Sequence, residues 1–253
     1  MANEKKIVWG KTDDNLFEFV TLLTTGDDAP NDLLNQALDL TRNTFCQDET
    51  ISICSGVSIN PAAAEELVEL SRVTANDGLT IVAIEKATGK VASVLFNKLQ
   101  VKPAPNEIPF YTAFIQSIKQ KPAIDLINFM LEVDEKINLY EHYKTDCLLE
   151  NMFLITHKNY RGKNLAGGVT EATLRLAQAI NNREYDVEKY KNITIGAANA
   201  IATGNLSRHV FVDKVKYDCL LDVNSSEFVF NGNKITDILP EQKLISVVAK
   251  RIE

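Results

Sequence analysis

One segment constrains the fold of this chain more than any other: an apolar run, a basic turn and a helical pattern that follows at once. The run is DCLLENMFLITH (146–157), and its nearly continuous apolar second half predicts a strand buried on both faces. The turn after it is rich in Lys, Arg, Asn and Gly. A helix is predicted next, because residues spaced three or four apart would lie on one of its faces. These residues are Val169, Ala172, Thr173, Leu176, Ala179 and Ile180. Backbone N–H groups at such a helix start suit a phosphate.

The remaining elements indicate one mixed α/β domain over residues 1–253. Strands are predicted at 16–23, in a hairpin over 78–101, and at 192–200, 217–223 and 243–252. Helices are predicted after residue 31, after Asn60-Pro61, over 123–140 and over 205–215. The proline-rich stretch 102–122 cannot be one long helix. It begins an insertion at about 102–143, between the third and fourth predicted strands.

Bulk properties exclude several classes of protein. The net charge of −7 argues against a nucleic-acid partner. No apolar run is long enough to cross a membrane, and no apolar signal core follows the first lysines, so we expect a cytoplasmic protein with no membrane partner. The four cysteines form no CxxC pair, which predicts reduced thiols and no metal site. A monomer and a homodimer both stay open.

The turn does not match two common phosphate-binding motifs. A P-loop has its lysine after the second glycine, whereas Lys163 precedes Gly167 and Gly168. The dinucleotide fingerprint GxGxxG is absent. An ordinary glycine-containing connection between a strand and a helix remains an alternative.

The segment Arg161-Gly162-Lys163-Asn164-Leu165-Ala166 resembles the (Gln/Arg)-x-x-Gly-x-(Gly/Ala) loop of the GNAT superfamily of N-acyltransferases. Asn164 replaces the middle glycine, and Asn tolerates left-handed backbone geometry better than other side chains. The order of predicted elements is also that of the GNAT fold, over roughly 15–250. The resemblance implies an α/β fold with a mixed central sheet, splayed between the fourth and fifth strands and flanked by helices.

The resemblance also implies that the co-substrate is acetyl-CoA. Its pantetheine arm would pair with the backbone of Phe153, Leu154, Ile155 and Thr156. Its pyrophosphate would meet amides of Arg161, Gly162, Lys163, Asn164, Leu165 and Ala166. A β-bulge amide near Leu154 or Ile155 would support the oxyanion.

An acidic segment after the first helix supplies the candidate base. FCQDETIS (45–52) resembles the Asp-Glu-Pro-Leu segment of insect-type arylalkylamine N-acetyltransferases, in which the Glu acts as general base through water. The resemblance assigns this role to Glu49. Thr50 and Ile51 depart from the pattern, so two solvated acids at a helix end are the alternative.

Hydroxyl groups near the last helix are candidates for returning a proton to the thiolate. The same resemblance points to Ser207, with Thr203 one turn earlier; Ser207 could equally bond its own backbone at a helix start. Many GNAT enzymes place a Tyr in this helix, whereas this chain has Phe211 or Val212 there. We expect His142, His157 and His209 to lie outside the reaction.

These features predict an acetyl-CoA-dependent N-acetyltransferase of a small primary amine, with direct transfer in a ternary complex. The resemblance favours an arylalkylamine of the dopamine, tyramine, octopamine or serotonin type. A different acyl donor, a polyamine or amino-acid acceptor, and a non-catalytic acyl-CoA-binding protein remain alternatives. We expect the insertion to cover the amine, with an aromatic and apolar set drawn from Phe110, Tyr111, Phe114, Phe129 and Met130.

Overall fold

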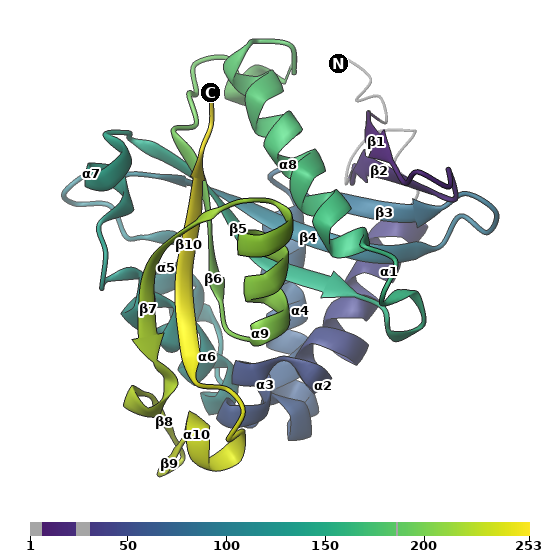
Figure 1. Cartoon of the computed structure of the whole chain (residues 1–253). Coiled ribbons are helices and arrows are strands. Elements are labelled where there is room, and N and C mark those ends of the chain that lie inside the picture. Colours follow the sequence, from purple (N-terminus) through teal and green to yellow (C-terminus); the bar gives the residue numbers. More distant parts are fainter. Residues whose placement is uncertain (1–6, 24–30, 186) are drawn as a thin grey trace.

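An eight-stranded sheet in the order β1-β2-β3-β4-β5-β6-β10-β7 organises the molecule. The computed structural model describes residues 7–23, 31–185 and 187–253 (Figure 1). The strands are β1 Val8–Lys11, β2 Phe17–Thr21, β3 Ile81–Glu85, β4 Val91–Val101, β5 Cys147–Thr156, β6 Ala197–Ala202, β7 Asp218–Asn224 and β10 Leu244–Arg251. The predicted mixed α/β class is confirmed.

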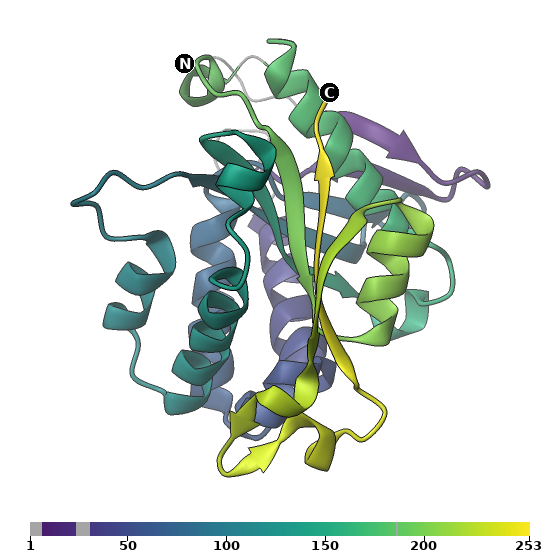
Figure 2. The ribbon, with the colours of Figure 1, turned by 60° about the vertical axis from the view of Figure 1, so that its left-hand side comes forward.

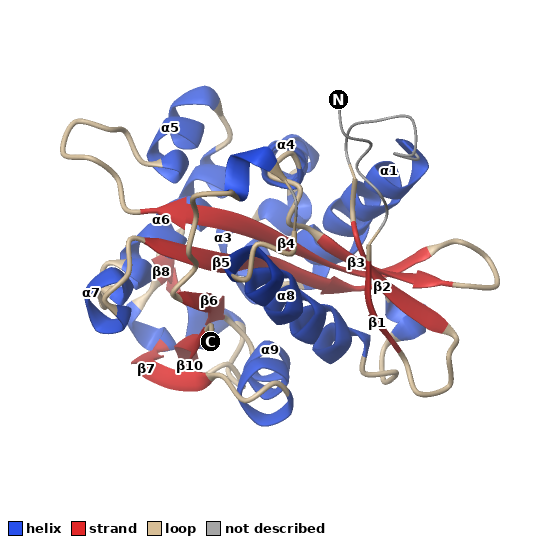
Figure 3. Cartoon of the chain, turned by 90° about the horizontal axis from the view of Figure 1, so that it is seen from above, coloured by secondary structure: helices blue, strands red, loops and turns tan. Residues whose placement is uncertain are grey.

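Helices cover both faces of this sheet (Figure 3). One face carries α1 Asn31–Leu40, α2 Cys46–Asp48, α3 Thr50–Ser55, α4 Pro61–Ala75 and the insertion helices. The other face carries α8 Leu165–Asn181, with α9 Asn205–Arg208 and the π-helical turn His209–Lys214 beside it. Two separate apolar cores result, one on each side of the sheet. All six residues predicted for the inner face of α8 are buried.

The sheet opens between β5 and β6, which are its parallel neighbours. Their pairing runs only from Leu148↔Ala197 to Glu150↔Asn199, after which β5 keeps β4 as its partner and β6 keeps β10 (Figure 1). The expected splay between the strands predicted at 146–157 and 192–200 is therefore confirmed. The pairing of β5 with β4 slips between Asn151 and Phe153, which makes Met152 the bulged residue. The bulge predicted near Leu154 or Ile155 was misplaced.

The segment between β4 and β5 forms three helices: α5 Phe110–Ser117, α6 Lys121–Asp134 and α7 Leu139–Tyr143. Figure 2 shows these teal helices beside α4, on the side of the molecule away from α8. The continuous helix predicted over 123–140 is wrong. Asn138 accepts a bond from the Glu141 amide at 3.2 Å and so starts a new helix, because a side-chain cap competes with helix continuation. Pro122, expected outside the helix, lies in the first turn of α6.

Several smaller differences concern the edges of the sheet. Four short elements were not predicted, because each has too few residues to show an apolar period. They are the edge strand β1, β8 Val229–Phe230, β9 Asn233–Lys234 and α10 Ile235–Ile238. No described helix has the length and apolar character needed to span a bilayer. All four cysteines are free thiols, as expected.

Candidate active site

A break in the helical backbone positions Glu49. The chain continues from α1 through a π-helical turn, Thr41–Phe45, into α2, and then becomes extended at Glu49 (φ −76°, ψ 141°). This conformation makes Glu49 the N-cap of α3. Its Oε1 accepts from the Ile51 amide at 2.9 Å, and its Oε2 accepts from the Ser52 amide at 2.7 Å. These two bonds fix the carboxylate at the start of α3.

Thr203 reaches the same carboxylate from the opposite side of the splay. It follows β6, and its Oγ1 donates to Glu49 Oε1 at 2.7 Å although the two residues are 154 positions apart in the chain. Glu49 is half-buried. A carboxylate has about four acceptor positions, and three donors occupy three of them. One position is left for the N–H group of an amine or for a water molecule.

Ser207 is engaged locally. Its hydroxyl donates to the Gly204 carbonyl at 2.9 Å, and the Gly204 amide donates back to Ser207 Oγ at 3.2 Å. This is the backbone-bonded arrangement left open by the sequence. Gly204 itself faces Thr50, since a Cβ at Gly204 would lie 3.4 Å from Thr50 Oγ1 and 3.9 Å from Ser207 Oγ. Ser207 therefore lies at the margin of the site that Glu49 and Thr203 share.

The turn before α8 has the backbone conformation that the loop requires. Gly162 has φ +81°, and Asn164 has φ 56° and ψ 24° as the N-cap of α8. Asn164 therefore adopts the left-handed geometry expected where the resembling loops carry glycine. The Gly168 amide bonds the Asn164 carbonyl at 3.1 Å. The amides of Leu165, Ala166 and Gly167 precede it, where helix geometry supplies no intrahelical partner, so they can bind an anion.

Basic side chains surround this turn, and two of them contact the residue next to Glu49. Asp48 pairs with Arg161 at 2.9 Å and with Lys158 at 3.2 Å. Because all three side chains are about a third to a half exposed, these ion pairs are weak and an anionic ligand can compete for the cations. The sequence suggested no partner for Asp48, because Arg161 is 113 positions away.

The β5 wall of the splay carries the residues expected along the pantetheine arm. The side chains of Phe153 and Ile155 pack into the core on the α1 side, and Leu154 packs on the α8 side. Phe45, in the turn before Glu49, stacks on Phe153 with ring centroids 4.3 Å apart. The helix that presents Glu49 is thus packed directly on this strand.

Two thiols lie near the candidate base. Burial, and secondarily the charge of Glu49, raises the pKa of Cys46 to about 12 and that of Cys54 to about 11. Both stay protonated at neutral pH and are therefore poor nucleophiles. The histidines are engaged elsewhere: the His157 ring accepts from the Asn159 amide at 3.2 Å, and His209 Nδ1 lies 2.7 Å from Asp213. His142 is exposed on α7.

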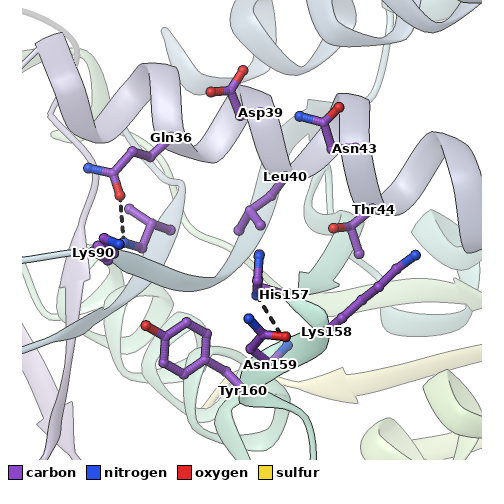
Figure 4. Close-up of a pocket in the computed structure, with 11 residues that line it drawn as sticks. Gln36, Asp39, Leu40, Asn43, Thr44, Lys90, His157, Lys158, Asn159 and Tyr160 are labelled. Carbon is purple, nitrogen blue, oxygen red and sulfur yellow. Dashed lines mark hydrogen bonds between the residues drawn. The ribbon is translucent and has the colours of Figure 1, made fainter.

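A cleft of about 610 Å³ adjoins the turn on the α1 side. Figure 4 shows Gln36, Leu40 and Thr44 of the helical layer facing His157, Lys158 and Tyr160. Two hydrogen bonds brace its walls, from the Val91 amide to Gln36 Oε1 and from the Asn159 amide to His157 Nδ1 (Figure 4). Among the described residues, Glu49, Thr203 and Ser207 do not line it, so this cleft is separate from their contact.

Searches with the sequence against protein-family models and against curated proteins give no match. Searches with the structure give clear ones. The chain is similar to arylalkylamine N-acetyltransferase 2 from Aedes aegypti, with a TM-score of 0.74 and 21% identity over 94% of this chain and 100% of that chain. It is also similar to mosquito arylalkylamine N-acetyltransferase like 5b, with a TM-score of 0.71 and 14% identity over 93% and 99%.

A third similar structure is an agmatine N-acetyltransferase, with a TM-score of 0.68 and 11% identity over 86% of this chain and 94% of that chain. The first two similarities cover 93–94% of this chain. The chain therefore has the GNAT fold of the insect-type N-acetyltransferases.

Proposed function

We propose that the protein is an acetyl-CoA-dependent N-acetyltransferase that acts on a small primary amine, with an arylalkylamine as the favoured class. One observation carries the proposal: the contact between Glu49 and Thr203, which joins the helical layer to the end of β6. The fold supports it, because similar structures carry the names of arylalkylamine N-acetyltransferases. The name of the agmatine enzyme keeps a polyamine-like acceptor as the second candidate.

The acyl donor would be held by backbone groups at two places. The pyrophosphate would accept bonds from amides of the turn 161–166, and Arg161 and Lys163 would supply positive charge. Lys163 Nζ lies 5.5 Å from the centre of the Phe17 ring of β2. The pantetheine arm would add to the edge of β5 at Phe153 to Thr156, where β6 has diverged. The thioester would then reach the splay between Met152 and the Glu49–Thr203 contact.

Transfer would proceed without a covalent enzyme intermediate. Glu49 accepts a proton from the amine, directly or through water, using its remaining acceptor position. The amine nitrogen then attacks the thioester carbonyl, the new C–N bond forms, and the C–S bond breaks. Amides of the bulge at Met152 stabilise the oxyanion. A hydroxyl donor returns a proton to the thiolate; Thr203 is better placed for this than Ser207.

The test is acetyl transfer by Glu49→Gln, measured as thiol release with acetyl-CoA and a panel of tyramine, dopamine, serotonin and spermidine. General-base catalysis contributes about 100- to 10,000-fold, so kcat/KM is expected to fall by at least about 100-fold while acetyl-CoA binding is kept. Glu69→Gln, an exposed acid on α4, serves as the matched control.

Glu49→Gln also replaces the cap of α3, so a folding check accompanies it. Thr203→Val leaves that cap intact and removes only the hydroxyl contact. A slower transfer in both variants, with unfolding midpoints close to that of the parent, supports the proposal. Unchanged kcat/KM in both variants contradicts it, as does a parent that releases no thiol with any amine of the panel.

A further inference from the structure

A second cleft, of about 530 Å³, lies between the insertion and the sheet. Its walls come from β4, β5, β6 and helices α5, α6 and α7, on the sheet face opposite α8. Its floor includes Glu150 and Asn199, which are paired at the last point where β5 and β6 still touch. The cleft therefore sits behind the vertex of the splay. It shares no residue with the Glu49–Thr203 contact.

Four acids line this cleft: Glu107 and Glu135 are exposed, whereas Glu150 and Asp134 interact with each other and have no cation of the described residues in an ion pair with them. Glu150 is only 4% exposed, and its Oε2 accepts from Gln100 Nε2 at 2.7 Å. Asp134, at the end of α6, is partly exposed on the opposite wall. In the described part of the chain, neither carboxyl takes part in an ion pair. The nearby Lys98 is committed to Asp77 at 2.8 Å and to the Phe110 ring, whose centre is 4.2 Å away.

The pKa values of both acids are raised, so ionising the two together is unfavourable. Burial, followed by the charge of Glu150, raises the pKa of Asp134 well above its usual range. Burial also raises the pKa of Glu150, against the bond from Gln100 and the charge of Lys98. Without a cation the pair therefore tends to keep a proton, and an added positive charge would relieve the cost of ionising both acids.

An unsatisfied oxygen beside the acids points to a ligand. Asn199 is 5% exposed, and its Oδ1 has no hydrogen-bond partner among the described residues. A buried amide oxygen without a donor is unfavourable, so it indicates a missing donor group. Apolar and aromatic side chains also line the cleft, among them Leu99, Phe110, Leu131, Ile137, Tyr140 and Leu148. A cleft that combines carboxylate and amide acceptors with apolar and aromatic side chains matches a protonated amine with an apolar body.

We propose that the cleft between α5–α7 and the sheet binds such an amine, with its ammonium group held by Asp134, Glu150 and Asn199 Oδ1. The insertion supplies Asp134 and the aromatic wall, and the sheet supplies the other two acceptors. The site does not depend on the proposed acetyl transfer. The sequence holds one signal for it, the acid Glu150 inside the strand predicted at 146–157, although the pattern of that segment indicates only a strand.

Binding of the amine would be coupled to the release of protons from the two acids. The groups facing Glu150 are Lys98 and Gln100 from β4, Tyr111 from α5, Asp134 from α6 and Tyr140 from α7. Both tyrosines have raised pKa values and stay neutral, so in this group the two acids, whose pKa values are also raised, exchange the proton. An ammonium group lowers the pKa of each acid, and protons are released on binding. The affinity for the amine should therefore rise with pH.

The experiment is calorimetric titration of the full chain with phenethylamine, without an acyl donor, compared with the neutral phenethyl alcohol. Asp134→Asn and Glu150→Gln are each expected to weaken amine binding by at least about tenfold, because charge-assisted bonds are lost. Glu132→Gln, an exposed acid on the same helix, should bind within about twofold of the parent. Titrations in two buffers of different ionisation enthalpy report proton release, which Asp134→Asn should reduce.

Equal affinities for the amine in the parent and both cleft variants would overturn the proposal, as would equal affinities for the amine and the alcohol. Should Glu150→Gln fail to fold, Asp134→Asn at its partly exposed position carries the test. The Michaelis constant for phenethylamine in acetylation then separates two sources of the ligand. A raised Michaelis constant in Asp134→Asn identifies the acceptor itself, and an unchanged one with weaker binding identifies a separate amine.

Discussion

At the scale of single residues, the candidate site depends on backbone positions as much as on functional groups. Asn164 holds a left-handed conformation where the resembling loops have glycine, and this could be anticipated from the residue type. Glu49 and Thr203 could be named through the resemblance, but their contact could not, because 154 positions separate them. Only the assembled sheet brings the end of β6 onto the start of α3.

The conformation of Asn164 leads to a prediction about stability. Asn164→Ala should lower the free energy of unfolding by about 1–2 kcal/mol, because alanine is disfavoured at positive φ. Asn164→Gly keeps the conformation accessible and should change stability by less than about 1 kcal/mol. Urea unfolding of both variants provides the measurement. An alanine variant as stable as the glycine variant would show that the turn is not held in this geometry.

Asp48 leads to a prediction about ligand binding. Asp48→Asn frees Arg161 and Lys158 from their ion pairs, so acetyl-CoA should bind more tightly, by up to about fivefold for exposed charges. The gain should shrink at high salt, since screening weakens exposed charges. Asp39→Asn, an exposed acid on α1, is the control. Weaker binding in Asp48→Asn would show that these cations do not face the ligand.

At the scale of elements, periodicity predicted the existence of most strands and helices, because their apolar faces are buried. It failed where a local hydrogen bond ends a helix that the apolar pattern continues, as at Asn138 between α6 and α7. It also missed the π-helical turn Thr41–Phe45, which has no recognisable pattern, and the bulge at Met152, which depends on the pairing with β4. These features position Glu49 and the vertex of the splay.

The packing of α8 on β2 offers a test at this scale. A Cβ at Gly168 would lie 2.0 Å from the Phe19 ring, whereas one at Gly167 would meet only the movable Asn164 side chain at 2.7 Å. Gly168→Ala should therefore destabilise the protein by about 1–3 kcal/mol through overpacking. Gly167→Ala, in the same helix turn, should cost clearly less. Thermal unfolding compares the two, and similar midpoints would contradict the close approach of α8 to β2.

At the scale of the whole molecule, periodicity predicted the fold class and the order of the main elements, whereas the splay was implied only by the resemblance to the GNAT fold. The second cleft could not be predicted, since it combines residues from β4–β6 with an insertion whose packing no local pattern specifies. The net charge of −7 likewise gave no hint that two acids lie together inside.

Those two acids should make global stability depend on pH. The folded-state pKa values of Asp134 and Glu150 are raised above their unfolded values, so the folded state binds more protons. Their stabilising contribution is complete below the unfolded pKa values, near 4, and is lost as pH rises through the folded values. Asp134→Asn should flatten this fall in unfolding free energy, measured by urea unfolding at several pH values. A parent whose stability rises steadily over that range, and equally in Asp134→Asn, would contradict this assignment.

The central claim is that the turn 161–166 binds the diphosphate of acetyl-CoA and brings the thioester to Glu49. A crystal structure with coenzyme A tests it most directly. We expect diphosphate oxygens about 3 Å from amides between Gly162 and Ala166, with the thiol in the splay beside the Glu49–Thr203 contact. A coenzyme bound elsewhere, with Arg161 still paired to Asp48 and the splay filled by side chains, would contradict it.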